Sequence, residues 1–83
     1  MNYQVILDMS SIVDKAKKHK LKLGRFGQLS LVLDIEANDP DDACHSAFKM
    51  FCDEVLEHSP SVETKNLLRE LKYEFLVMCV LEL

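Results

Sequence analysis

A change of hydrophobic period between residues 27 and 57 constrains the fold of this chain more than any other feature. Over residues 27–37 (GQLSLVLDIEA), apolar and polar positions alternate, which is typical of a strand with one face on a core and one face nearer to water. The apolar side of this predicted strand consists of Leu29, Leu31, Leu33 and Ile35. After residue 39 the apolar spacing becomes helical, so a strand followed by a helix is predicted.

The predicted helix covers residues 40–57. Asp39 is a suitable N-cap, and Pro40 takes the first helical position, where a missing N–H costs nothing. Asp41 and Asp42 place negative charge against the positive end of the helix dipole. Apolar residues then recur at helical spacing, namely Cys44, Ala47, Phe48, Phe51, Cys52 and Val55.

Two further strands are predicted, one at each end of the chain. Residues 2–9 alternate, with one side formed by Tyr3, Val5, Leu7 and Met9. Residues 75–81 are apolar on both sides, with Leu76, Met78 and Val80 opposite Phe75, Val77, Cys79 and Leu81. Because a strand that is apolar on both faces is usually covered on both, we expect this last strand to be central in its sheet.

The remaining segments allow alternatives. Residues 10–20 form either a short helix capped by Ser10 or Ser11, or a loop that leads into a strand at 20–23, followed by a turn at 24–27. Residues 60–70 form a short helix or turn with Ser61 as its cap. The predicted fold class is α+β, as a single domain over 1–83. It has a small three- or four-stranded sheet, the 40–57 helix packed on one face, and the order β-(α or loop)-β-α-α-β.

The second apolar face of the last predicted strand indicates self-association. One layer of helix covers only one face of a sheet, so the second apolar face of the last strand needs the segment 10–20 or another subunit. A chain of 83 residues also has a thin stability margin, which oligomerisation commonly improves. We therefore expect a homodimer, with Leu76, Met78 and Val80 as the candidate interface. The leading functional prediction is a small, non-enzymatic protein-interaction or regulatory module.

Charge is distributed unevenly, although the net charge is only −4. Residues 1–25 carry six lysines or arginines against two aspartates, whereas residues 26–83 carry four against twelve acidic residues. A nucleic-acid-binding protein is therefore the first alternative, because a basic segment can contact phosphates. Its candidate contacts are Lys15, Lys17, Lys18, Lys20, Lys22 and Arg25, beside Phe26. The competing interpretation is a solvated face paired with the acidic helix, and the net acidity opposes non-specific binding.

The acidic residues suggest a second alternative, a mimic of nucleic acid that blocks a protein binding it. The residues concerned are Asp34, Glu36, Asp39, Asp41, Asp42, Asp53, Glu54 and Glu57. A capped helix with a polar outer side explains the same residues without any such role.

No motif in the chain predicts a catalytic residue, a metal site or a cofactor. Adjacent Cys44 and His45 lack the paired spacing of zinc ligands, and the GRFG sequence at 24–27 lacks phosphate-loop spacing. Three cysteines fit a disulfide framework poorly, so free thiols in the cytoplasm are expected. The start has no signal-peptide pattern and no apolar run approaches the ~20 residues of a membrane helix.

Overall fold

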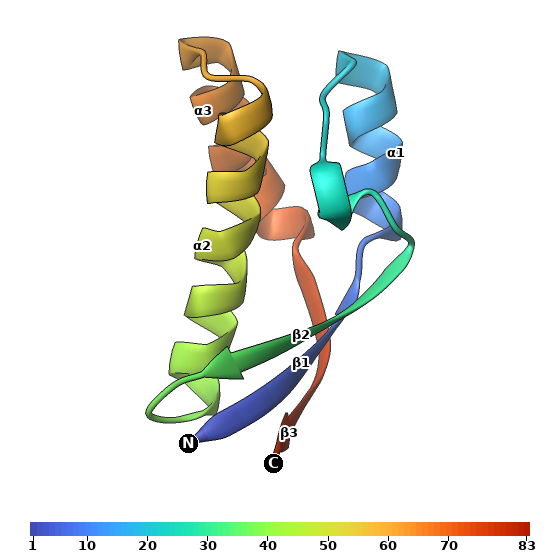
Figure 1. Ribbon diagram of the computed structural model, residues 1–83. Helices are drawn as coiled ribbons and strands as arrows, with labels where there is room; N and C mark the ends of the chain where they lie inside the picture. Colours follow the sequence, from blue (N-terminus) through green and yellow to red (C-terminus); the bar gives the residue numbers. More distant parts are fainter.

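The computed structural model describes all residues from 1 to 83 and confirms the α+β class (Figure 1). Three strands form one sheet, and three helices accompany it in the order β-α-β-α-α-β. The elements are β1 (Asn2–Asp8), α1 (Ser10–His19), the short 3₁₀ helix η1 (Gly24–Phe26), β2 (Ser30–Glu36), α2 (Pro40–His58), α3 (Val62–Leu71), the short 3₁₀ helix η2 (Lys72–Glu74) and β3 (Leu76–Glu82).

The sheet has the strand order β2-β1-β3, and both pairings are antiparallel. The first strand is therefore central and the last strand lies at an edge. The prediction of a central last strand was wrong, because β3 pairs only with β1, and its second apolar side is exposed. Apolar character on both faces of a strand indicates burial only when something packs on each of those faces.

A β-bulge in β3 changes which of its side chains face the helices. Ile6 pairs with Cys79 while Leu7 pairs with Val77, so Met78 is an extra residue opposite that step. As a result, Val77 and Val80 both pack against the core although they are three positions apart, whereas residues on one face of a regular strand are an even number of positions apart. The predicted grouping of Leu76, Met78 and Val80 on one face was wrong for this reason.

Helix α2 lies across the sheet and contacts all three strands (Figure 1). Its buried stripe repeats every four residues and consists of Ala43, Ala47, Phe51 and Val55, all fully buried. Phe51 is central to an aromatic cluster, with ring centroids 5.4 Å from Phe26, 5.5 Å from Phe75 and 6.0 Å from Phe48. The small alanines let the helix approach the sheet closely, and the phenylalanines fill the wider space beside them.

The caps of the two later helices are those that the sequence predicts. Asp39 accepts a hydrogen bond from the backbone N of Asp42 at 2.8 Å, and Pro40 is the first residue of α2. Ser61 accepts from the backbone N of Thr64 at 3.1 Å at the start of α3. Each bond satisfies a backbone N–H that has no partner within its own helix.

The segment 10–20, for which the sequence allows a helix or a loop, forms a helix, and no strand follows it at 20–23. Neither serine caps α1 as predicted. Instead, the carboxylate of Asp8 accepts from the backbone N of Ser10 at 3.0 Å and from its Oγ at 2.7 Å. The helix ends at His19, and the next residue, Lys20, has a left-handed φ of 55°. Gly24, with φ of 58°, then turns the chain into η1 at little steric cost.

Candidate interaction surfaces

One face of the sheet has no helix on it. Register places Val32, Ile6 and Cys79 in a row across the three strands, with Leu76 and Leu81 in the neighbouring rows. Val32, Leu76 and Leu81 are 52%, 49% and 45% exposed. We call this surface, formed by Ile6, Val32, Leu76, Cys79 and Leu81, the open face. Large apolar side chains exposed next to one another are typical of interaction sites.

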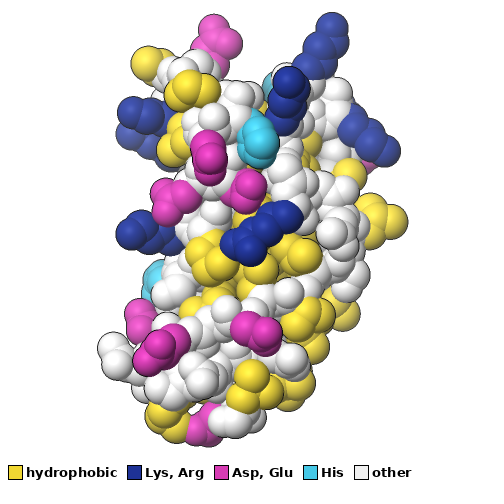
Figure 2. All heavy atoms as spheres, viewed as in Figure 1, with side chains coloured by type: hydrophobic (Ala, Val, Ile, Leu, Met, Phe, Trp, Pro, Cys, Tyr) yellow, Lys and Arg dark blue, Asp and Glu magenta, His cyan; other side chains and the backbone are white.

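The charges around the open face are all acidic. Asp8, Asp34 and Glu36 lie on it, and no strand contains a lysine or arginine. Figure 2 shows the same segregation, because lysine and arginine side chains gather over the upper half of the molecule and none appears over the strands below. The β3 side of the open face carries no charge between Leu76 and Leu81.

The predicted interface residues are therefore only partly on this surface. Leu76 lies on the open face, Met78 is exposed at the bulge, and Val80 packs toward the core. Sequence reasoning missed Cys79 and Leu81, which the bulge turns outward. No signal in the sequence marks Met78 as a bulge, because the extra residue is apolar like its neighbours.

The predicted basic segment is divided by the fold into paired and unpaired cations. Lys15 forms an ion pair with Glu74 at 2.7 Å, and Arg25 lies 3.7 Å from Glu54 and over the ring of Phe26. Phe26 is fully buried and therefore has no free ring face for a base. The four cations without a carboxylate within 4 Å are Lys17, Lys18, Lys20 and Lys22. They are exposed at the carboxyl end of α1, where positive charge is also favoured by the helix dipole.

Glu74 joins the start of β3 to α1. Its carboxylate accepts from Lys15 Nζ at 2.7 Å and from Ser11 Oγ at 2.6 Å. The hydrogen bond from Lys15, followed by that from Ser11, lowers the pKa of this carboxyl below its ordinary value. The charged form of Glu74 is therefore the form that stabilises the contact.

Replacing Glu74 with glutamine is expected to lower the urea midpoint of unfolding at pH 7. The pKa of Glu74 is lower in the folded state than in the unfolded state. Its contribution to the free energy of unfolding is therefore complete at pH values above the ordinary pKa of a glutamate, and it is lost as the pH falls through the folded-state pKa. The difference between wild type and Glu74→Gln should thus shrink by about pH 3. Glu70→Gln, which removes an exposed carboxylate with no ion pair, is the control, and an equal effect of both changes would contradict this assignment.

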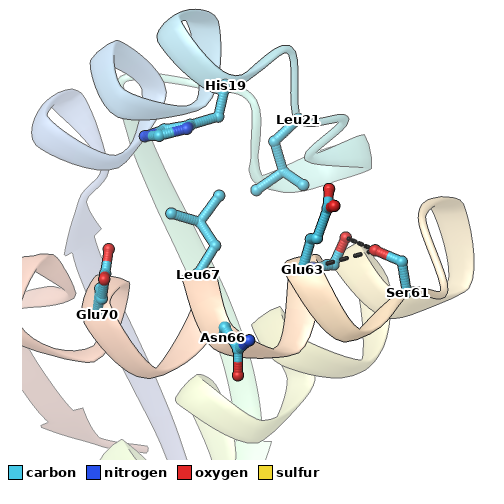
Figure 3. A pocket seen from close by; sticks show the side chains of 8 residues that line it. His19, Leu21, Ser61, Glu63, Asn66, Leu67 and Glu70 are labelled. Carbon is cyan, nitrogen blue, oxygen red and sulfur yellow. Dashed lines mark hydrogen bonds between the residues drawn. The ribbon is translucent and has the colours of Figure 1, made fainter.

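A hollow of about 360 Å³ lies between the end of α1 and α3 (Figure 3). In Figure 3, Leu21 and Leu67 point toward one another across it, and Glu63 rises from α3 beneath Leu21 while Glu70 lies on the side of His19. The hydroxyl of Ser61 is bonded to Thr64 at 2.9 Å and also caps α3. The hollow thus has an apolar centre and an exposed polar rim. The hydroxyl of Ser61, which lines it, already serves as the cap of α3.

The cysteines and acidic residues form no further site. Cys44 and Cys52 are free and partly buried, and burial together with Asp41 and Asp53 raises the pKa of their thiols. No group of three or more His, Cys, Asp or Glu side chains lies close enough to hold a metal ion. In the acidic stretch at the start of α2, Asp39 and Asp42 are both engaged by backbone N–H groups. Helix capping accounts for these two residues without a mimic of nucleic acid.

Comparison with known proteins found no matching family model, no matching curated protein and no matching solved structure. None of the helices combines the length and the apolar character that crossing a membrane requires.

Proposed function

We propose that the chain is a homodimeric protein-interaction module whose subunits meet through the β3 side of the open face. The observation that carries this proposal is the exposure of Leu76 and Leu81 beside Cys79, on a sheet face that no element of the chain covers. Burying apolar surface is the main driving force of most protein association. The three free cysteines favour a reducing compartment, and we place the module in the cytoplasm.

Charge favours a two-fold arrangement with β3 near the axis. A two-fold contact brings the same patch of both subunits together, so a patch of one charge sign opposes association. The β3 side is uncharged between Leu76 and Leu81, whereas Asp34 and Glu36 lie on β2, at the opposite edge of the sheet. Asp8 lies opposite Leu76 at the end of β1, and its carboxylate accepts hydrogen bonds from Ser10. Two copies joined through β3 therefore bury apolar side chains and keep these carboxylates at the rim.

Sedimentation equilibrium between about 1 and 100 μM protein tests the proposal, because weak dimers dissociate in this range. The expected result is a mass that rises from the monomer value of 9.5 kDa to twice that value. Alkylation of the exposed Cys79 thiol should slow over the same concentrations, because the contact covers it. A monomer at the highest concentration, with constant Cys79 reactivity, would contradict the proposal.

A second candidate function is nucleic-acid binding, favoured by the four lysines of the basic segment that have no carboxylate within 4 Å, Lys17, Lys18, Lys20 and Lys22. Four phosphate contacts predict that affinity for labelled oligonucleotides falls on the order of a hundredfold between about 50 and 200 mM salt. Fluorescence anisotropy measures this change. The triple variant Lys17→Glu, Lys18→Glu, Lys20→Glu should abolish binding, and Lys65→Glu, Arg69→Glu, Lys72→Glu is the control with equal charge. No binding at low salt removes this candidate.

A further inference from the structure

A second groove, of about 310 Å³, lies between α2 and α3. Its apolar floor is formed by Phe48, Cys52 and Leu56 from α2, together with Leu68 from α3. The first three are spaced four residues apart, so they form a continuous line along one side of α2. They lie beside the core stripe of this helix and are only partly buried.

The rim of the groove along α3 and the first residue of η2 is cationic. Lys65, Arg69 and Lys72 line it, and no aspartate or glutamate does. Their spacing of four and three residues places them in a row about 10 Å long. All three are exposed, and none has a carboxylate within 4 Å. An apolar floor thus lies beside three unpaired positive charges.

We propose that this groove binds an acidic amphipathic helix of a partner protein. Apolar side chains of that helix enter the groove, and its carboxylates, spaced four and three residues apart, face Lys65, Arg69 and Lys72. A helix laid in an apolar groove is a recurring mode of peptide recognition. The row of Lys65, Arg69 and Lys72 determines which helices bind, because these positive charges attract a helix with an acidic flank and repel one with a basic flank.

Binding of a partner helix in this groove is separate from self-association and does not depend on it. The groove belongs to the helices, whereas the open face lies on the side of the sheet that they leave uncovered. A variant that prevents dimer formation, such as Leu81→Asp, is therefore expected to keep its affinity for the acidic helix. Failure of one proposal can be recognised separately from failure of the other.

Fluorescence anisotropy with a labelled synthetic peptide tests the proposal. The probe is a helical peptide of about four turns with leucines on one face and glutamates along the adjoining flank. The matched control peptide has lysine in place of every glutamate. The acidic peptide is expected to bind and the basic peptide not to bind, whereas equal binding of the two peptides would overturn the proposal.

Charge reversal in the protein locates the site. The triple variant Lys65→Glu, Arg69→Glu, Lys72→Glu should weaken binding on the order of tenfold or more, because three exposed ion pairs are replaced by repulsion. The control, Lys17→Glu, Lys18→Glu, Lys20→Glu, changes the net charge equally on α1 and should have little effect. Circular dichroism checks that both variants remain folded. Equal losses in the two variants would overturn the assignment to this groove.

Cys52 reports occupancy from the floor of the groove. In a Cys44→Ser, Cys79→Ser background it is the one thiol left, and saturating acidic peptide should slow its alkylation by iodoacetamide. An unchanged alkylation rate at saturation would place the peptide elsewhere. Decanoate competing as strongly as the peptide would assign the groove to small anionic amphiphiles and would also overturn the proposal.

Discussion

Replacing Phe51 with alanine is expected to lower the free energy of unfolding by about 3–5 kcal/mol. The Phe51 ring is fully buried and lies within 6.0 Å, between ring centroids, of Phe26, Phe48 and Phe75. Its removal leaves a cavity where α2, η1 and the start of β3 meet, which the neighbouring rings fill only in part. A domain of 83 residues has roughly 4–12 kcal/mol of stability, so this loss is a large fraction of the total.

Urea denaturation followed by circular dichroism measures the effect of Phe51→Ala. Val62→Ala is the control, because Val62 is 72% exposed on α3 and its truncation should change the free energy of unfolding by less than about 0.5 kcal/mol. If Phe51→Ala does not fold, Phe51→Leu keeps most of the volume and gives a smaller, measurable loss. A loss below about 1 kcal/mol for the alanine variant would contradict the central position of this ring.

Dimer dissociation should respond most strongly to charge placed on the β3 side of the open face. The double variant Leu76→Asp, Leu81→Asp is expected to raise the dissociation constant on the order of a hundredfold or more. In a two-fold contact each substitution occurs twice, so four carboxylates replace four apolar side chains in the same buried surface. Because both leucines are about half exposed in the monomer, the fold itself should tolerate the change.

The matched control for this variant is Val62→Asp with Leu29→Asp. These side chains are 72% and 65% exposed, and neither belongs to the open face. Sedimentation equilibrium should give the wild-type dissociation constant for the control. Equal dissociation constants for the wild type and Leu76→Asp, Leu81→Asp would show that any dimer forms through another surface.

The helices and strands of this protein could be predicted from local patterns, because the physics that sets them is local. Alternation located β2, and Asp39, Pro40 and Ser61 located the starts of α2 and α3 through caps that the structure contains. The place of β3 in the sheet was predicted wrongly. Whether an apolar face is covered depends on which element packs on it, and neither that packing nor the bulge at Met78 leaves a local pattern.

The candidate surfaces were harder to predict, because each joins segments that are distant along the chain. Lys15 forms an ion pair with Glu74, and Arg25 forms one with Glu54. Four of the six cations predicted to contact nucleic acid therefore have no carboxylate partner. The α2–α3 groove was missed altogether. The spacing of Lys65, Arg69 and Lys72 is visible in the sequence, but only the packing of α3 against α2 places them beside an apolar floor.

The strand order also has a consequence for how the protein folds. β1 pairs with β2 through contacts within the first half of the chain, whereas its pairing with β3 joins residues on the order of seventy positions apart. Closing so long a loop costs entropy before any contact repays it, so docking of β3 is expected to be the slow step. Until β3 docks, one side of the central strand offers its backbone N–H and C=O groups to any neighbour, including β3 of another copy.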